Sequence, residues 1–258
     1  MKDQADKLNS LGIRTEVINS MKTPGEIADI LEDLRWNDES VHPIRFIYIA
    51  PERLRSRAFI ASLSDLPISL LAIDEAHCIS QWGHDFRTSY LQVRDFIKLL
   101  ELDAKGIPIM ALTATATQKV RTDIIERLGL KKYETFIKGF DRPNIAIVVR
   151  EISKKDAKFA KMLEIINKTP GVGIIYCSTI NHVEEVNEFL NRNNIASGKY
   201  TGSVTGSDRE NIQNAFMDDD LKVMVATNAF GMGIDKKDIR FIIHYNLPGS
   251  IESYYQEA

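Results

Sequence analysis

Short runs of apolar residues alternate along the chain with stretches in which apolar residues recur at the spacing of a helix. Several of the apolar runs contain no alternating polar residues, a pattern typical of strands buried on both faces of a parallel sheet. The predicted strands are Arg45–Ile49, Leu70–Ile73, Ile109–Leu112, Ile145–Val149, Gly173–Tyr176, Val223–Ala226 and Phe241–His244. The predicted helices are Met1–Leu11, Gly25–Trp36, Thr117–Leu128 and Val183–Leu190.

An alternation of strands and helices favours an α/β fold with right-handed crossover connections. Pro143 cannot continue a helix and biases Arg142 toward extended backbone, so we expect a domain boundary at this point. The chain is then divided into two α/β domains, residues 1–140 and 141–258. The first is expected to be incomplete, because it opens with a helix that no strand precedes. The strand residues expected to be buried are Leu70, Ala72, Ile109, Ala111, Ile175 and Val225.

The composition is that of a globular protein, with 258 residues, 44% hydrophobic and 27% charged. This excludes a disordered tail, a collagen-like rod and a disulfide scaffold. No run of eighteen apolar residues exists and the N-terminus has no apolar core, so we expect neither a membrane span nor a signal peptide. Two cysteines, Cys78 and Cys177, are too few for a zinc site, which favours a reducing compartment.

The charge balance gives no sign of a basic domain. The net charge is -3, with 19 Lys+Arg against 20 Asp+Glu in residues 1–140 and 14 against 16 in residues 141–258. Any contact with nucleic acid must therefore come from a local patch. Arg53, Arg55 and Arg57 form the densest basic cluster of the first half, a pattern that by itself favours a solvated helix face.

Two adjacent carboxylates, Asp74 and Glu75, directly follow the apolar run that ends at Ile73. Ligands of open α/β sheets bind at the carboxyl ends of the strands, and Mg²⁺ prefers one or two carboxylates together with phosphate oxygens. Asp74 therefore suits a Mg²⁺ contact, and Glu75 could activate a water for attack on a phosphoryl group. The alternative is that both carboxylates cap the following helix, where negative charge is favourable in any case.

An aromatic segment follows the carboxylates and brings Trp82, Phe86 and Arg87 within a few residues of one another. Aromatic faces stack on bases and arginine pairs with phosphate, so the segment could form a platform for a single strand. Trp82 and Phe86 could instead be an i, i+4 core pair on a helix, although Gly83 between them disfavours a helix. The pattern alone leaves both interpretations open.

Residues 74–87 (DEAHCISQWGHDFR) closely resemble the DEAH box and the aromatic-rich loop of RecQ-family DNA helicases. The resemblance covers essentially the whole chain, and its motifs occur in the order of the family. Residues 50–54 (APERL) are similar to a motif that touches the DNA backbone, 111–116 (ALTATA) to motif III and 140–144 (FDRPN) to the linker between the domains. Residues 173–177 (GIIYC), 225–235 (VATNAFGMGID) and 251–257 (IESYYQE) are similar to motif IV, motif V and the approach to motif VI.

The resemblance implies two RecA-like domains, with mainly parallel sheets flanked by helices, that use ATP and Mg²⁺ to move along DNA. Asp74 would hold Mg²⁺ and Glu75 would activate the attacking water, which makes them the catalytic pair. Several residues are implied to couple the state of the ATP to the DNA. They are His77, Gln81, Trp82, His84, Phe86, Arg87, Thr113 and Thr115.

The resemblance also implies two sets of binding residues. Those for ATP and Mg²⁺ are Asp74, Glu75, Gly231, Gly233 and Asp235. Without the resemblance, Gly231 and Gly233 would be only weak evidence of a nucleotide site, because no third glycine completes a dinucleotide-binding motif. Those for DNA are Arg53, Trp82, Phe86, Arg87 and Thr227. The implied partners are single-stranded DNA and duplex junctions, with movement from 3′ to 5′ and a role in recombination or repair. The implied location is the cytoplasm with the nucleoid in a prokaryote, or the nucleus in a eukaryote.

Some motifs of the family have no match in the printed sequence. It contains no G-x-x-x-x-G-K-[ST] loop for phosphates and no arginine after Arg240 that could belong to motif VI. The cysteine-rich zinc domain and the winged helix of the family also have no counterpart. Residues 200–203 (YTGS) differ from the Tyr-His-Ala-Gly-like run that is usual there. We therefore expect a helicase core truncated at both ends and inactive alone.

Three hypotheses follow for the function. The first is a fragment of an ATP-dependent DNA helicase of the RecQ type. The second is a DNA-binding or interaction module without enzymatic activity, derived from a helicase. The third is a hydrolase that holds a metal directly with Asp74, Glu75 and His77, which is remote because the helical histidine spacing of such zinc sites is absent.

Overall fold

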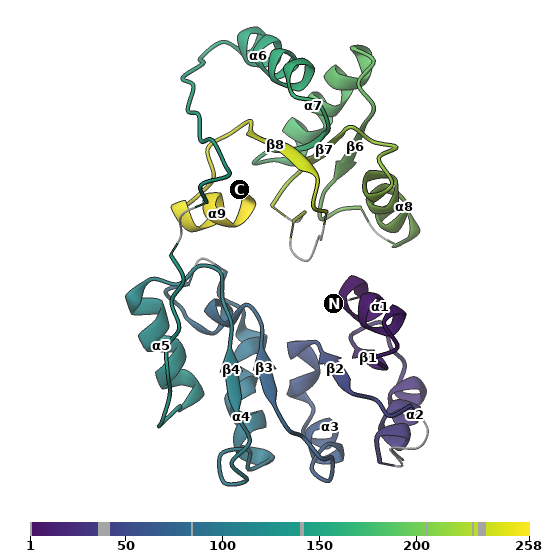
Figure 1. Ribbon diagram of the computed structural model, residues 1–258, viewed down its shortest axis with the longest axis vertical. Helices are drawn as coiled ribbons and strands as arrows, with labels where there is room; N and C mark the ends of the chain where they lie inside the picture. The colour runs from purple at the N-terminus through teal and green to yellow at the C-terminus, as the bar shows by residue number, and fades with distance from the viewer. Residues whose placement is uncertain are drawn as a thin grey trace. The chain divides into compact units, whose positions relative to one another are not determined.

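A computed structural model of the chain describes residues 2–35, 42–83, 85–139, 142–204, 206–228, 230–231 and 236–258. The chain forms two compact units, Met1–Glu134 and Thr135–Ala258. In each unit helices surround short parallel strands, so the predicted α/β class is confirmed (Figure 1). The expected domain boundary stays a prediction, since Phe140 and Asp141 lie outside the described residues. Among the described helices, none has the length and apolar character that crossing a membrane requires.

The strands of the first unit pair in parallel, two by two. Strand β1 (Thr15–Ile18) pairs with β2 (Phe46–Ile49), and β3 (Leu71–Ile73) pairs with β4 (Ile109–Ala111). The α-helices are α1 (Lys2–Ser10), α2 (Pro24–Arg35), α3 (Arg57–Ser62), α4 (Gln92–Leu99) and α5 (Gln118–Leu128). Three short 3₁₀ helices are η1 (Pro51–Arg55), η2 (Ala76–Ile79) and η3 (Thr88–Leu91).

One apolar cluster forms the core of the first unit. Ile73 of β3 lies in it together with Phe96 of α4 and Val120 and Ile124 of α5. Thr117 caps α5, because its side chain accepts a hydrogen bond from the backbone N–H of Val120. The core therefore holds α4 and α5 against one face of the β3–β4 pair.

The other face of the β3–β4 pair is open in the described part of the chain. Leu70 is 46% exposed and Ala72 is also exposed, so the prediction that both are buried is wrong. Met110, opposite Ala72 in the register, is 46% exposed as well. Side chains alternate across a strand, and the described helices cover only the face to which Ile73 points. Ile109 and Ala111 are half-buried rather than fully buried.

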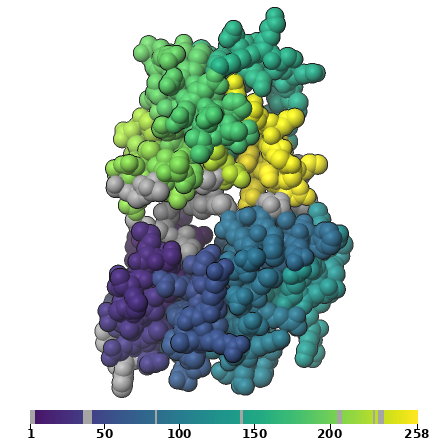
Figure 2. All heavy atoms as spheres, turned by 180° about the vertical axis from the view of Figure 1, so that it is seen from behind, coloured from purple at the N-terminus to yellow at the C-terminus, as the bar shows by residue number. Residues whose placement is uncertain are grey.

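The second unit contains one parallel sheet in the order β6-β7-β5-β8. Its strands are β5 (Val172–Tyr176), β6 (Ser197–Tyr200), β7 (Val223–Ala226) and β8 (Ile239–His244). Its helices are α6 (Lys155–Lys168), α7 (Ile180–Arg192), α8 (Gly206–Met217) and α9 (Ile251–Glu257). Teal and green atoms, the colours of α6 and α7, form much of the outer surface of this unit in the space-filling view (Figure 2).

Two apolar clusters enclose the central strands of the second unit from both faces. One contains Ile175 and Val225 with side chains of α6 and α7, and the other contains Met224 with Phe216 of α8. All residues of β5 and β7 are buried, and Ile175 and Val225 are 0% exposed. Their predicted burial is confirmed.

One predicted strand is absent from the described residues, and two observed strands were not predicted. The expected strand Ile145–Val149 is wrong, because the segment has no strand partner and its Val149 is 83% exposed. A high β-propensity becomes a strand only where a neighbouring edge accepts it. Strands β1 and β6 were not predicted, since both are short and β6 contains Gly198 and Lys199 in place of an apolar run.

Candidate active site and nucleic-acid interface

Backbone pairing brings the ends of β3 and β4 together. The Leu112 N–H donates to the Ile73 carbonyl and the Ala76 N–H donates to the Leu112 carbonyl, both at 2.8 Å. Between them Glu75 has a left-handed backbone with φ of +50°. A non-glycine residue in this conformation costs about 1–3 kcal/mol and such residues cluster at functional sites. The pairing thus places the carboxylates beside the residues that follow β4.

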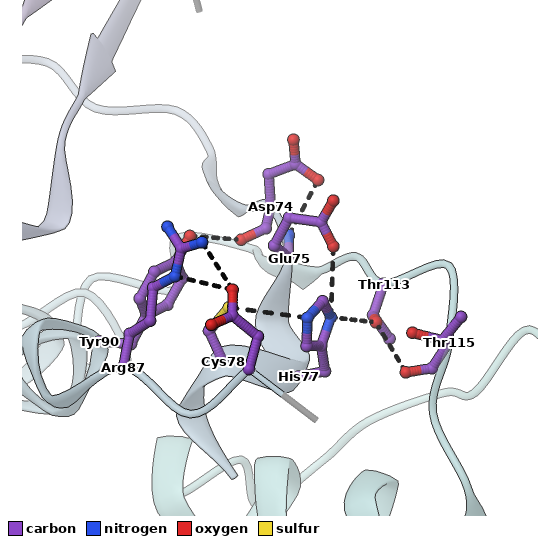
Figure 3. A network of polar contacts seen from close by, with 9 residues as sticks. Asp74, Glu75, His77, Cys78, Arg87, Tyr90, Thr113 and Thr115 are labelled. Atoms are coloured by element: carbon purple, nitrogen blue, oxygen red, sulfur yellow. Dashed lines mark hydrogen bonds and ion pairs between the residues drawn. The ribbon is translucent and has the colours of Figure 1, made fainter. Parts of the chain in front are cut away.

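His77 connects the carboxylates to the segment after β4. Its ring is 1% exposed, and Nδ1 lies 3.2 Å from Oε2 of Glu75 and 3.0 Å from Oγ1 of Thr113. The Thr113 hydroxyl donates to the Thr115 carbonyl at 3.3 Å, as the dashed lines in Figure 3 show. Because the Thr113 proton goes to Thr115 and a carboxylate only accepts, we assign a proton to Nδ1 of His77. Glu75, His77, Thr113 and Thr115 therefore form one polar relay.

Asp74 leaves an oxygen available beside this relay. Its Oδ1 accepts the Glu75 N–H at 2.9 Å, and its backbone carbonyl accepts the Tyr90 hydroxyl at 3.2 Å. The side chain is exposed, and within the described residues Oδ2 has no hydrogen-bond partner. An exposed carboxylate oxygen at a strand end fits a Mg²⁺ contact. The alternative that Asp74 and Glu75 cap the following helix is not supported, because Glu75 occupies the N-cap position of η2 and its side chain makes no capping hydrogen bond.

The aromatic segment, residues 80–87, is not helical in its described part. Trp82 is 61% exposed, so the alternative of a Trp82–Phe86 core pair on a helix is excluded. Gln81 is also exposed, and Phe86 is half-buried. His84 lies outside the described residues. The segment therefore presents one large aromatic ring to solvent directly after the relay.

Arg87 is held by a neighbouring carboxylate. Its Nε and Nη2 donate to Oδ2 of Asp85 at 2.9 and 2.6 Å, and this hydrogen bonding raises the pKa of Arg87. The same carboxylate lies 3.9 Å from the buried Cys78 thiol, whose pKa is raised to about 12 by burial first and by Asp85 next. Cys78 is therefore a protonated, unreactive thiol at neutral pH. Asp85 and Tyr90 were not predicted as site residues: Asp85 lies within the motif of residues 74–87 but was given no role there, and Tyr90 lies outside every motif.

Arg53 has partners inside the first unit. Its guanidinium donates to the backbone carbonyls of Asn19 and Lys22, with the Nη2 to Lys22 distance at 2.8 Å. These bonds hold the loop that follows β1. The predicted contact of Arg53 with DNA would use whatever part of the guanidinium these bonds leave accessible.

The remaining predicted residues belong to the second unit. Thr227 follows β7 directly and is half-buried, with its N–H on the Tyr200 carbonyl at 3.2 Å. Gly231 has φ of +118°, and a Cβ there would meet Oη of Tyr176 at 2.6 Å, so the position requires glycine. Gly233 and Asp235 lie outside the described residues.

Comparisons with known proteins agree with this arrangement. Two protein-family models match, "DEAD/DEAH box helicase" over residues 1–123 and "Helicase conserved C-terminal domain" over residues 157–258. The ATP-dependent DNA helicase RecQ of Bacillus subtilis (strain 168) is 44% identical over 258 residues, which are 100% of this chain and 42% of that protein. The ATP-dependent helicase wrn-1 of Caenorhabditis elegans is 43% identical over 267 residues, covering 100% of this chain and 24% of that protein.

A solved structure shows the same fold at low sequence identity. The Dbp5 protein of S. cerevisiae bound to RNA and ADP BeF3 has a TM-score of 0.71 and 15% identity, covering 99% of this chain and 63% of that chain. The chain thus has the two RecA-like domains of a DEAD/DEAH-box helicase. Within that class it belongs to the RecQ family of ATP-dependent DNA helicases. It spans 39–42% of the length of the bacterial RecQ relatives that it matches.

Proposed function

We propose that this chain is the core of a RecQ-type helicase, which couples ATP hydrolysis to 3′–5′ translocation and unwinding of DNA. The observation that carries the proposal is the buried His77, which lies 3.2 Å from the Glu75 carboxylate and 3.0 Å from Thr113 and precedes the exposed Trp82 by five residues. A group that touches the candidate catalytic carboxylate and precedes a base-stacking platform is suited to coupling. The family of the chain supports the same reading.

Asp74 and Glu75 are proposed as the catalytic pair. The exposed oxygen of Asp74 would hold Mg²⁺, which when bound neutralises charge on the phosphates. Glu75 would orient the attacking water and accept its proton. The contact with His77 and the strained backbone at Glu75 limit the positions that its carboxylate can take. Gly231, Gly233 and Asp235 are proposed to contribute to ATP binding from the second unit.

The coupling is proposed to run through the relay to the aromatic segment. A movement of the Glu75 carboxylate would change its contact with His77. The hydrogen bonds of His77 with Thr113, and of Thr113 with the Thr115 carbonyl, would pass this change toward α5. Stacking of one base on Trp82 contributes about 1–3 kcal/mol of binding free energy. This is enough to move the aromatic segment, whose first residues are hydrogen-bonded to η2. Gln81, His84, Phe86 and Arg87 are proposed to share this coupling role, and Arg53 and Thr227 to contact the DNA backbone.

The proposed substrate is DNA with a single-stranded part, including duplex junctions. Such a protein would act with the nucleoid in a prokaryote or in the nucleus of a eukaryote. The printed sequence has no phosphate-binding loop of the G-x-x-x-x-G-K-[ST] type. Because that loop cradles the nucleotide phosphates, we expect the chain by itself to bind single-stranded DNA with little ATP turnover.

The third hypothesis, a directly metal-bound hydrolase, has less support. It requires ligand atoms of Asp74, Glu75 and His77 to converge. The only convergent group of three such ligands in the described residues is His77, Cys78 and Asp85, which lacks both catalytic carboxylates. We therefore prefer the helicase.

The test uses a hybrid in which this chain replaces the 258 residues that it matches in the Bacillus subtilis RecQ. Glu75→Gln and Asp74→Asn should each lower the ATPase rate by about 10²–10⁴-fold while single-stranded DNA binding stays nearly normal. Glu126→Gln, an exposed acid on α5, is the matched control. Unwinding should require a 3′ rather than a 5′ tail. A near-normal ATPase rate in Glu75→Gln would remove it from the catalytic role.

A further inference from the structure

Lys119 of helix α5 contacts the exposed indole of Trp82. Its Nζ lies 3.1 Å from the centroid of the Trp82 ring. The lysine is exposed, and Trp82 is 61% exposed. The contact is a cation–π interaction, in which an ammonium group lies over the negative face of an aromatic ring. Lys119 therefore occupies a face of the ring that the aromatic segment presents to solvent.

The charge of Lys119 is not neutralised by a carboxylate in the described part of the chain, where its partner is the uncharged indole. Two other cations of α5 have partners of their own. Arg121 donates to the Ala116 carbonyl at 2.8 Å. Arg127 donates to the Asp123 carboxylate at 2.8 Å. The ammonium of Lys119 thus keeps its full positive charge at the surface, where a phosphate can pair with it.

The place of Lys119 in α5 does not favour a lysine. It is the second residue of the helix, whose cap is Thr117. The N-terminus of a helix has a partial positive charge, so a cation in the first turn is slightly unfavourable. The charge of Lys119 therefore does not stabilise α5, and the favourable contact that the structure shows for it is the one with Trp82.

A base and the ammonium group cannot occupy the same face of the indole. Carbon atoms of stacked rings lie about 3.5–4.0 Å apart, and a nitrogen at 3.1 Å from the centroid fills that space. An exposed cation–π contact changes an equilibrium constant about 2–5-fold, whereas a stacked base changes it about 5–150-fold. A base can therefore displace Lys119, whose flexible four-carbon stem keeps the displaced ammonium near the strand.

We propose that Lys119 covers the stacking face of Trp82 in the absence of DNA, is displaced by a base, and then pairs with a phosphate of the same single strand. The proposal rests on the proposed function, since it requires DNA at Trp82. Lys119 is then a DNA-binding residue that exchanges an aromatic ring for a phosphate. The exchange gives its charge a favourable partner in both states.

The first test follows the Lys119 side chain by NMR in the 258-residue chain, with lysine labelled with carbon-13 at the ε position. The ring current of the indole should shift the Lys119 signal upfield of the other lysines, and Lys119→Arg assigns the signal by removing it. Trp82→Ala should return the signal to the ordinary position, and saturation with oligothymidylate should do the same. An ordinary position in the free chain contradicts the contact. A signal that stays upfield in the DNA-bound chain contradicts the displacement.

The second test measures the affinity for a labelled oligothymidylate by fluorescence anisotropy at several salt concentrations. One phosphate contact with a single strand adds about 0.7 to the slope of log K against log salt. Between about 50 and about 500 mM salt, Lys119→Gln should therefore lose about fivefold less affinity than the parent. Lys119→Arg, which keeps the charge, should keep the parent slope. Lys98→Gln, which removes an exposed lysine from the last turn of α4, is the matched control.

The outcomes separate this proposal from the proposed function. If the parent binds and Lys119→Gln keeps the parent slope, or if Lys98→Gln changes the slope equally, Lys119 has no specific phosphate contact. The proposal is then wrong while DNA binding stands. If the parent does not bind oligothymidylate, single-strand binding by this chain fails, and the displacement of Lys119 fails with it.

Discussion

The two units bury similar apolar strands in different ways. In the second unit every residue of β5 and β7 is buried, with a separate apolar cluster on each face of the sheet. In the first unit one cluster covers one face of the β3–β4 pair, and Met110 on the other face is 46% exposed. An apolar run thus predicts a strand, while the helices around it decide how many of its faces are covered.

The carboxyl ends of β3 and β5 also differ in their exposure to solvent. Strand β3 leads into the exposed Asp74 and the strained Glu75, where polar groups remain accessible. Strand β5 ends at Tyr176, which is 4% exposed and donates its hydroxyl to the Phe230 carbonyl at 3.1 Å. Burial raises the pKa of Tyr176 and raises that of Cys177 to about 12. The end of β3 therefore leaves the proposed catalytic carboxylates accessible, whereas the end of β5 is enclosed by packing.

The largest difference between the units should appear on truncating strand residues. Ile175→Ala in β5 should lower the free energy of unfolding by about 2–5 kcal/mol, because it leaves a cavity in a fully buried site. Met110→Ala in β4 should cost less than about 1 kcal/mol, since half of that side chain already meets solvent. Urea unfolding followed by circular dichroism measures both. Equal costs would contradict the open face of the β3–β4 pair.

Two glycines sharpen the comparison with a smaller effect. Gly83→Ala should cost about 1–3 kcal/mol, because its Cβ meets a backbone oxygen at 2.4 Å that cannot rotate away. Gly198→Ala in β6 should cost less, because its Cβ meets the far end of Leu221 at 2.6 Å and that side chain can turn. Thermal unfolding of the two variants ranks them. The reverse ranking would show that the aromatic segment is loosely packed on η2.

The helix caps are expected to behave alike in both units. Thr117 caps α5 and Thr179 caps α7, each accepting from the backbone N–H three residues on, at 3.4 and 3.2 Å. Each Thr→Ala change should cost about 0.5–2 kcal/mol, and Thr→Ser should restore most of it. Thermal denaturation checks the pairs. A cost at one cap only would mean that the other bond is not made in solution.

The two buried thiols give the smallest expected effect, which depends on pH. Burial raises the pKa of Cys78 and of Cys177 to about 12, above the ordinary value near 9. Between pH 9 and 12 the thiols ionise in the unfolded chain but stay protonated in the folded chain. The contribution of the thiols to the free energy of unfolding is therefore fully present below pH 9 and is lost as the pH rises toward 12. Cys177→Ala should therefore show a shallower alkaline loss of stability than the parent. Identical slopes between pH 8 and 10.5 would indicate an accessible thiol.

Local patterns predicted the well-covered elements closely. Val223–Ala226 is strand β7 as expected, and the predicted helix from Thr117 is α5 with Thr117 as its cap. Ala72 was misjudged because the cover of a strand face comes from helices distant in sequence. The unpredicted β6 is an edge strand with little apolar character.

The candidate site was only partly visible in the sequence. Asp74, Glu75 and His77 stand out because they follow an apolar strand. The contacts of Tyr90 with Asp74 and of Lys119 with Trp82 join residues 16 and 37 positions apart, and only the folded chain brings these pairs together.

The central claim is that the open end of β3 couples ATP hydrolysis to single-stranded DNA. The most direct measurement is the ratio of DNA-stimulated to DNA-independent ATPase in the Bacillus subtilis hybrid with and without Trp82→Ala. Loss of a stacked base costs about 1–3 kcal/mol, so we predict a ratio about 5–150-fold lower at limiting DNA, with the DNA-independent rate unchanged. An unchanged ratio in a folded variant would contradict the claim.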